Sequence, residues 1–493
     1  MKPAQGKPIA SATGARCPSP HRAPTNCGID AYRSAVAAKR IATPTVGLTR
    51  VPDLNPAMFP HQASVTDFAL RGGRTALFLD TGLGKSLCAL DWGRIVVEHT
   101  NEPVLMLAPL AVAAQHQREA EKFGIDARAI REPDQITTPR VYITNYDRLD
   151  KFDPSAFGGV ILDESSILKS MNGRTSKSLI QAFSDTRFRL ACTATPAPND
   201  HSELGQHSDF LGTLSASQML TRWFIHDSAD TGTWRMKGHA VRDFWSWVAS
   251  WARCVSKPSD LGFSDDGFAL PPLNLERHVV KADRSLDSGA EKDGQGRLFR
   301  IPDTSATSIH REKRMTIEAR ADLIAEIVAR EPSEPWVIWC DTDYEADALV
   351  ARIPGAIEVR GSMTADQKEE RLTAFSTGQA RILITKPSLA GFGLNWQHCA
   401  RMAFVGLSFS YEAFYQAIRR CWRFGQTRPV SVHVACADTE ESIWQVVNRK
   451  SGDHDAMKRE MTAAMRRAVR IEHEQSPYEP TAPVQLPSWM TAA

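Results

Sequence analysis

A glycine-rich turn that ends in lysine and serine is the first segment of this sequence whose residue types point to chemistry. Residues 80–86 read Asp-Thr-Gly-Leu-Gly-Lys-Ser and directly follow the apolar run at 75–79. Glycines in such a turn let backbone N–H groups approach phosphate oxygens, and the following helix adds the positive end of its dipole. Lys85 would reach the outer phosphates, and the Ser86 hydroxyl would ligate Mg²⁺. Leu79 stands where the usual pattern begins with glycine, so an accidental helix-opening turn is the alternative for this segment alone.

Two adjacent carboxylates, Asp163 and Glu164, end a second apolar run at 160–162. Asp163 at the strand tip would hold Mg²⁺ through water, and Glu164 would polarise an attacking water. A solvated acidic pair at a strand end is the alternative, but the phosphate-binding turn upstream favours the functional interpretation. The next apolar run ends in Thr-Ala-Thr-Pro at 193–196, whose hydroxyls would link the nucleotide site to a second site by short hydrogen bonds. An ordinary strand-end turn explains these four residues equally well.

A basic and aromatic segment at 416–426 offers the cations that such a site needs. On a helix, Gln416, Arg420 and Arg423 fall at i, i+4 and i+7, which is one face. Two guanidinium groups on one face suit a γ-phosphate, with at least one acting as an arginine finger. A solvated basic helix is the alternative, although Trp422 and Phe424 indicate that this face is partly covered.

Short apolar runs alternate with helical patterns around these segments, in two stretches of the chain. The first stretch has candidate strands at Ala76–Leu79, Val104–Ala108, Val141–Thr144, Val160–Leu162 and Phe188–Cys192, and candidate helices at Lys85–Val97 and Val112–Phe123. The second has candidate strands at Trp336–Cys340, Ala356–Val359, Ile382–Thr385, Met402–Val405 and Val430–Cys436, and candidate helices at Glu412–Trp422 and Glu441–Arg449. This alternation predicts the α/β class, with two parallel sheets covered by helices and ligands bound at the carboxyl ends of the strands.

Between the two stretches, from about 214 to 306, the alternation lapses. Phe244, Trp247, Val248 and Trp251 have helical spacing and predict one buried face. Basic residues are interleaved with these aromatic residues, so direct contact with nucleic acid is the alternative to core packing, which the pattern favours.

Composition excludes several classes of protein. A chain of 493 residues suggests about two to four domains. No apolar run approaches the ~18 residues that span a bilayer and the N-terminus has no apolar signal core, so a cytoplasmic location is expected. The nine cysteines are scattered without a C-x-x-C pair, which indicates neither a disulfide framework nor a cysteine-based zinc site. The net charge of +2 comes from residues 1–50, where eight Lys and Arg face Asp30 alone, so any nucleic-acid contact would be a local groove.

Taken in order, these segments resemble the Swi/Snf-type branch of the superfamily-two helicases and translocases, over roughly residues 55–450. Further motifs of this branch resemble Phe59-Pro60-His61-Gln62, Ala108-Pro109-Leu110, Thr144-Asn145-Tyr146, Asp163-Glu164-Ser165-Ser166 with Lys169, Thr193-Ala194-Thr195-Pro196 with Asn199 and Glu203-Leu204, and Thr385 with Gly391-Phe392-Gly393-Leu394-Asn395. The last motif of the branch resembles Gln416, Arg420, Arg423, Gly425 and Gln426. The Asp-Glu-Ser-Ser form is similar to helicase-like proteins of bacteriophages and prophages, and a leucine at position 79 is typical of the branch.

The resemblance implies two RecA-like lobes in tandem with a mainly helical insert between them. We expect a disordered basic arm at 1–50, ATP-binding lobe 1 at 51–213, a Trp-rich helical insert and linker at 214–306, C-terminal lobe 2 at 307–455, and a C-terminal helix with a Pro-rich tail at 456–493. The expected catalytic residues are Lys85, Glu164, Arg420 and Arg423, and the expected Mg²⁺ ligands are Ser86 and Asp163. The expected ATP contacts are Gln62, Thr81, Gly82, Leu83, Gly84, Lys85, Ser86, Gly393, Asn395 and Gln416. The expected nucleic-acid contacts are Pro109, Thr144, Asn145, Thr193, Thr195, Arg360 and Thr385.

The sequence thus predicts an ATP- and Mg²⁺-dependent helicase or translocase with a monomeric core, acting on DNA, duplex more than single-stranded, in phage or bacterial DNA metabolism. Other phage replication or nuclease proteins are candidate partners. An RNA helicase and an ATP-gated DNA clamp that recruits a partner are the alternatives. A single-lobe ring ATPase is disfavoured, because the chain carries a second α/β lobe of its own.

Overall fold

The computed structural model describes residues 45–109, 112–169, 173–226, 234–282, 306–390 and 394–474. These residues belong to one compact unit, Pro44–Ala493. The predictions for the N-terminal arm up to residue 44, for Leu110, for Gly391, Phe392 and Gly393, and for the tail from 475 onward lie outside the described residues.

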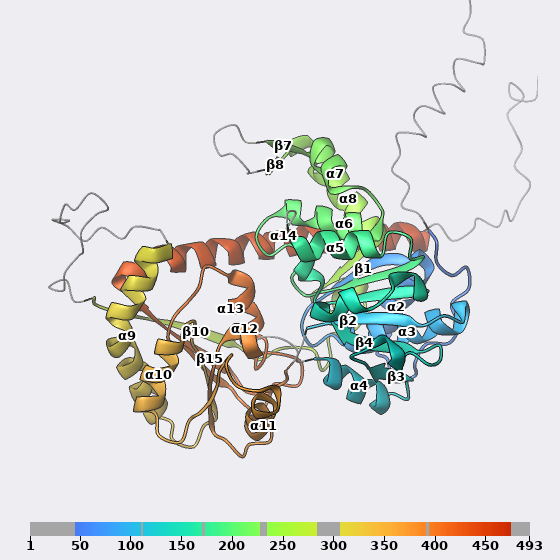
Figure 1. Cartoon of the computed structure of the whole chain (residues 1–493). Helices are drawn as coiled ribbons and strands as arrows, with labels where there is room; N and C mark the ends of the chain where they lie inside the picture. Colours follow the sequence, from blue (N-terminus) through green and yellow to red (C-terminus); the bar gives the residue numbers. More distant parts are fainter. Residues whose placement is uncertain are drawn as a thin grey trace, which may run out of the picture. The chain divides into compact units, whose positions relative to one another are not determined.

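The first sheet contains seven strands among the described residues, all parallel, in the order β3-β4-β2-β5-β6-β1-β9 (Figure 1). Their bounds are β1 Arg74–Leu79, β2 Val104–Ala108, β3 Ala127–Ala129, β4 Val141–Asn145, β5 Gly159–Asp163, β6 Phe188–Cys192 and β9 Ala252–Val255. The central strands are continuous apolar runs because helices cover both faces of a parallel sheet. The carboxyl ends of β1, β5 and β6 therefore place the glycine-rich turn, the acidic pair and Thr193 at one edge.

The helices of this first lobe are α2 Pro60–Gly72, α3 Lys85–Thr100, α4 Ala113–Lys122, α5 Arg174–Ala182 and α6 Leu204–Leu211. Helices α2 and α3 pack against each other and enclose a core that includes Leu70, Leu90, Trp92 and Phe188.

The second sheet contains six strands in the described part of the chain, also all parallel, in the order β10-β15-β14-β11-β13-β12. Their bounds are β10 Leu273–Val280, β11 Trp336–Trp339, β12 Ile357–Val359, β13 Ile382–Thr385, β14 Arg401–Phe404 and β15 Val430–Ala437. The helices of this lobe are α9 Ala306–Ala329, α10 Asp343–Arg352, α11 Ala365–Ser376, α12 Pro387–Ala390 and α13 Tyr411–Ile418. Two apolar clusters form its core, one around Trp339 and Trp396 and the other around Trp336 and Leu349. The prediction of two parallel-sheet α/β lobes is confirmed.

The Trp-rich segment forms helices α7 Ala216–Trp223 and α8 Val241–Trp251, with a short antiparallel pair, β7 Phe224–His226 and β8 Trp234–Met236. Phe244, Trp247, Val248 and Trp251 are all buried, so the face that the helical spacing predicts is a packing face. The segment also supplies β9 to the first sheet and β10 to the second, although the sequence pattern indicated only a helical insert and linker there. Strand β9 has four residues and β10 carries polar side chains, so pairing with neighbouring strands, rather than their own sequence, accounts for their strand conformation.

Helix α14, Glu441–Glu474, connects the two lobes. It begins after β15 of the second sheet and packs against α8 and β9 of the first lobe (Figure 1). Met465 of α14 joins the apolar core of the first lobe, and Arg466 pairs with Asp260 at 2.9 Å.

One prediction about local structure is wrong. Helix α13 begins with the Ser410 hydroxyl accepting a hydrogen bond from Ala413 N at 3.2 Å, and it ends at Ile418, so Arg420 and Arg423 lie beyond it in a series of turns. The Arg420 carbonyl accepts a hydrogen bond from Trp396 N at 2.9 Å instead of continuing the helical ladder. Tertiary pairing of that carbonyl ends the helix, and Gln416, Arg420 and Arg423 do not share one helical face.

The seven cysteines in the described ranges are all free and buried. Among the described residues, no helix is long and apolar enough to cross a membrane.

Candidate nucleotide site and strand-end pocket

The glycine-rich turn adopts a conformation that depends on its two glycines. Gly82 has φ +94° and Gly84 has φ +82°, in the left-handed region that favours glycine. A Cβ at Gly84 would lie 2.1 Å from Gln62 Nε2. Helix α3 begins at Lys85, whose Nζ donates to the Leu79 carbonyl at 2.9 Å. The turn is therefore folded as the sequence predicts, with Lys85 and Ser86 in the first turn of α3.

Gln62 holds this turn from the neighbouring helix. Its Nε2 donates to the Leu83 carbonyl at 3.1 Å, and its Oε1 accepts from Phe59 N at 3.0 Å. Four rings form an aromatic cluster beside Gln62, namely Phe59, His61, Phe268 and Phe424, with the Phe268 and Phe424 rings stacked at 4.7 Å between centroids. Phe268 of the linker and Phe424 of the second lobe thus meet the residues that precede the turn.

Asp163 is held by a histidine that the sequence analysis missed. His116 Nε2 of α4 lies 2.8 Å from Asp163 Oδ2, and both side chains are buried. Burial disfavours the charged carboxylate, but the facing His116 and Lys85 outweigh it and lower the pKa of Asp163 below its usual value. Tyr146 adds a hydrogen bond from its hydroxyl to the Asp163 carbonyl at 2.6 Å. The arrangement keeps Asp163 ionised, as a metal ligand must be.

Glu164 differs from Asp163 in its backbone conformation and in the direction of its pKa shift. Its φ of +53° is rare for a residue with a side chain, and such strain is maintained only by surrounding structure. Thr193 Oγ1 lies 3.5 Å from Glu164 Oε2 and also accepts a hydrogen bond from Thr195 N at 3.1 Å. Burial, reinforced by the neighbouring carboxylates, raises the pKa of Glu164, although Lys85 and Arg420 oppose the shift. Of the two threonine hydroxyls of Thr-Ala-Thr-Pro, that of Thr193 contacts Glu164, whereas the buried Thr195 hydroxyl has no hydrogen-bond partner among the described residues.

Asp80 connects the glycine-rich turn to the second lobe and to α14. Its carboxylate accepts from Thr81 N at 2.8 Å, from Arg419 Nη2 at 2.9 Å, from Lys458 Nζ at 3.1 Å and from the Tyr415 hydroxyl. Arg419 also donates to the Thr81 carbonyl at 2.9 Å. Burial opposes ionisation, but the two cations and these hydrogen bonds hold the pKa of Asp80 far below its usual value. We call Asp80, Tyr415, Arg419 and Lys458 the Asp80 cluster.

The two predicted arginine fingers lie in the second lobe and are bonded within it. Arg420 and Arg423 each donate to the Leu394 carbonyl at 3.1 Å, and Arg420 also donates to Gln416 Oε1 at 2.9 Å. Burial, with the neighbouring Arg423, lowers the pKa of Arg420 to about 10, while the charge of Glu164 acts in the opposite direction. Arg420 therefore lies close enough to Glu164 across the lobes to interact with it electrostatically. Asn395 is exposed, and Gly393 lies outside the described residues.

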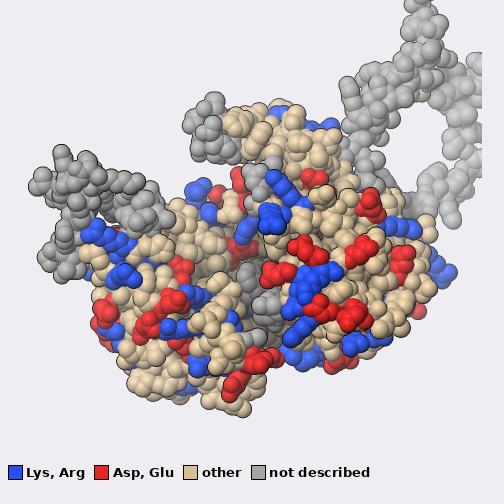
Figure 2. Space-filling view, viewed as in Figure 1, with Lys and Arg blue, Asp and Glu red and all other residues tan. Residues whose placement is uncertain are grey.

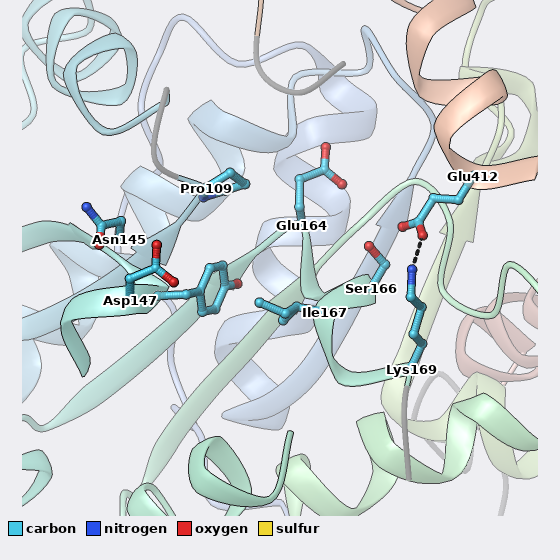
Figure 3. Close-up of a pocket in the computed structure, with 9 residues that line it drawn as sticks. Pro109, Asn145, Asp147, Glu164, Ser166, Ile167, Lys169 and Glu412 are labelled. Carbon is cyan, nitrogen blue, oxygen red and sulfur yellow. Dashed lines mark hydrogen bonds and ion pairs between the residues drawn. The ribbon is translucent and has the colours of Figure 1, made fainter. Parts of the chain in front are cut away.

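A pocket of about 350 Å³ lies where the ends of β4 and β5 meet the second lobe (Figure 3). Two predicted nucleic-acid residues, Pro109 and Asn145, line it together with Glu164. Lys169 and Glu412 form an ion pair across the lobes at its side. The strand-end motifs and Glu164, the predicted catalytic carboxylate, thus share one cavity.

The remaining predicted nucleic-acid residues are engaged in other contacts. Thr193 and Thr195 are fully buried, and the hydroxyls of Thr144 and Thr385 donate to the carbonyls of Ile130 and Val359 at 3.0 and 3.3 Å. Arg360 pairs with Asp347 and Glu358. All of these side chains except that of Thr195 therefore form bonds within the protein at or beside a strand end. The face shown in Figure 2 carries Lys and Arg interspersed with Asp and Glu.

Comparison with known families matches both lobes. The family described as DEAD/DEAH box helicase matches residues 59–204, and the helicase conserved C-terminal domain matches residues 319–425. The chain is 22% identical to the human DNA annealing helicase and endonuclease ZRANB3 over 451 residues, covering 81% of this chain and 40% of the relative. It is 22% identical to the bovine SWI/SNF-related matrix-associated actin-dependent regulator of chromatin subfamily A-like protein 1 over 455 residues, covering 83% and 45%.

A third relative is putative protein p41 of the Acyrthosiphon pisum secondary endosymbiont phage 1, which is 22% identical over 468 residues, covering 83% of this chain and 98% of the relative. The chain spans less than half the length of the two mammalian relatives and nearly all of the phage relative. The two matched domains lie in the order of the two lobes, and the ordered motifs run through both. The chain therefore carries a DEAD/DEAH box helicase domain followed by a helicase conserved C-terminal domain, and it is similar to a SWI/SNF-related protein over 83% of its length.

Proposed function

We propose that this protein is a DNA-dependent ATPase that uses ATP hydrolysis to move along duplex DNA. The observation that carries the proposal is the contact between lobes at the glycine-rich turn, where Arg419 reaches both Asp80 and the Thr81 carbonyl. Residues from both lobes therefore surround one turn, which suits a site that is completed only when the lobes close.

The residues at this site fit ATP. A Cβ at Gly82 would meet Phe424 and a Cβ at Gly84 would meet Gln62, so only glycine fits at these two positions of the turn. Around it, the buried Thr81 Oγ1, Gln416 Nε2 and Arg423 Nε have no hydrogen-bond partner among the described residues. A hydroxyl, an amide and a guanidinium donor of this kind suit phosphate oxygens. The aromatic cluster beside Gln62 offers apolar rings and an amide to the adenine base.

The chain's own groups divide the chemistry between them. Lys85 and the first turn of α3 would neutralise the phosphates, and Ser86 and Asp163 would hold Mg²⁺, which supplies charge for the transferred phosphoryl group. His116 keeps Asp163 oriented, as a hydrogen-bonded neighbour of a metal ligand does. Glu164 would accept a proton from the attacking water, and Arg420 and Arg423 would stabilise the transition-state charge when they leave the Leu394 carbonyl.

The DNA contacts are proposed for the 350 Å³ pocket and the adjoining surface between the lobes. Acidic and basic side chains are mixed on the face shown in Figure 2, which favours DNA binding along a local path between the lobes rather than across a broad basic face. The names of the two mammalian relatives point to DNA and chromatin, and the phage relative supports a role in phage or bacterial DNA metabolism. Binding through phosphates would be independent of sequence and sensitive to salt.

ATP hydrolysis measured without nucleic acid and with duplex DNA, single-stranded DNA or RNA tests the proposal. We expect duplex DNA to stimulate turnover most, and we expect displacement of the third strand of a triplex without separation of a duplex. Lys85→Ala and Glu164→Gln should abolish turnover and leave DNA binding intact, whereas the exposed control Lys177→Ala should behave as wild type. Turnover that no nucleic acid stimulates would favour the ATP-gated clamp, and stimulation by RNA alone would favour an RNA helicase.

A further inference from the structure

Three side chains with metal-binding atoms meet on the second sheet, away from the residues that form the proposed ATP site. Glu276 and His278 lie on β10, two residues apart and therefore on the same face of the strand. His433 lies on the neighbouring strand β15, directly opposite Glu276 in the parallel register. The strand pairing thus brings together residues that are 155 positions or more apart in the sequence.

The distances between the donor atoms suit a single ion. His278 Nε2 lies 3.0 Å from His433 Nδ1, and Glu276 Oε2 lies 3.5 Å from His433 Nδ1 and 4.0 Å from His278 Nε2. A tetrahedral zinc ion with bonds of about 2.0–2.1 Å holds its ligand atoms roughly 3.3 Å apart. The three observed separations bracket that value, so small side-chain rotations would place all three atoms at bonding distance.

We propose that Glu276, His278 and His433 form a binding site for a divalent transition metal, with Zn²⁺ as the ion that this donor set fits best. Two imidazoles and one carboxylate are a common zinc ligand set, and the fourth position would be taken by water. No cysteine takes part, and the three ligands come from two strands far apart in the sequence, so no local sequence motif marks the site.

Neighbouring side chains hold the two imidazole rings in place. The two rings stack at 5.2 Å between centroids, and Trp336 packs against the His433 ring at 5.8 Å on the inner side. Arg401 is bonded to Glu331 through two contacts at 2.6 and 3.1 Å, so its charge is largely compensated.

The exposure of the three side chains gives the ion a route in. His433 is 14% exposed, His278 is 28% exposed and Glu276 is 56% exposed, so the site opens toward solvent on the side of the carboxylate. Strand β10 is the edge strand of its sheet and pairs only with β15 among the described strands. An ion held by both strands would fasten this edge to the sheet and stabilise the second lobe by binding the folded state alone.

The test is metal binding to the untagged full chain after treatment with a chelator. Co²⁺ reports tetrahedral coordination by visible absorption, and Zn²⁺ is then titrated against it, with thermal unfolding followed in parallel. We expect one equivalent of metal per chain and a higher melting temperature with Zn²⁺. His278→Ala, His433→Ala and Glu276→Gln should each weaken binding at least about tenfold, whereas the exposed control His239→Ala should not.

Glu276→Gln keeps the proposal testable if a histidine variant fails to fold, because this exposed side chain changes only its charge. No binding of Co²⁺ or Zn²⁺ by the wild-type chain would overturn the proposal. Equal binding by wild type and by all folded variants would also overturn it, because the metal would then lie at another site.

Discussion

Replacing Asp80 with asparagine should release the second lobe from the glycine-rich turn. The Asp80 side chain is 14% exposed and faces Arg419 and Lys458, which are 4% and 13% exposed. Asparagine keeps an oxygen for Thr81 N but removes the charge, so two largely buried cations lose their counter-ion. Removal of one partner from a buried ion pair costs about 3–5 kcal/mol. Because opening of the lobes returns Arg419 to water, while Lys458 stays on the part of α14 that packs against the first lobe, up to the whole of this cost shifts the equilibrium toward the open state, at most by about two to four orders of magnitude.

Single-molecule energy transfer between the lobes, without nucleotide or DNA, measures this shift. Thr175→Cys and Glu370→Cys place dyes on exposed positions of the first and second lobes. The seven described cysteines are buried and should not react with the dyes, and Cys17 and Cys27 are replaced by serine in the parent chain. We expect a dominant high-transfer population in the parent chain and a dominant low-transfer population with Asp80→Asn. Asp67→Asn removes the carboxylate from an exposed pair with Arg71 and serves as the matched control. Identical distributions for the parent and Asp80→Asn would refute the reasoning.

Four further predictions concern the same site. His116→Ala should raise the Mg²⁺ concentration needed for half-maximal ATPase activity about 10–100-fold, because Asp163 loses the hydrogen bond that orients it; an unchanged requirement in a Mg²⁺ titration would contradict this role. Glu164 can act as a base only when it is ionised, and burial raises its pKa. As the solution is acidified, ATPase activity should therefore begin to fall at a higher pH than it would with a glutamate of ordinary pKa. The same raised pKa affects folding: Glu164 stabilises the folded state below its unfolded pKa, and this contribution is lost as pH rises through its folded pKa. The free energy of unfolding of Glu164→Gln, measured with urea, should lack this part of the pH dependence. Gly82→Ala should reduce ATPase activity more than tenfold, because the new Cβ would lie 2.7 Å from Phe424 Cβ, whereas Gly124→Ala, also at positive φ but with no atom within 4 Å, should retain activity.

The fold class was predictable because the strands of both lobes are continuous apolar runs. Val104–Ala108, Phe188–Cys192 and Ile382–Thr385 were each placed with the bounds that the structure has. Strands of this kind are buried on both faces, so composition alone marks them. The domain boundaries stay predictions, since β9 and β10 of the interlobe segment complete the two sheets.

The parts of the site that sequence reasoning missed depend on contacts between distant residues. His116 and Asp163 are 47 residues apart, and Arg419 and Thr81 are 338 residues apart. His116 lies in a polar helix without a motif around it, and Arg419 was passed over because helical spacing singled out its neighbours Arg420 and Arg423. The helix ends at Ile418, so that spacing did not apply, and only the packing of the lobes selects which arginine reaches the turn.

The rate of a single ATP turnover by Arg420→Ala, with duplex DNA present and ATP binding measured separately, tests most directly whether the second lobe completes the site. Arg428→Ala, which removes an arginine paired with Glu334 elsewhere on the same lobe, is the control. We predict that Arg420→Ala binds ATP with nearly unchanged affinity and hydrolyses it about 10³-fold more slowly. A folded Arg420→Ala protein that hydrolyses ATP at the wild-type rate would contradict the account.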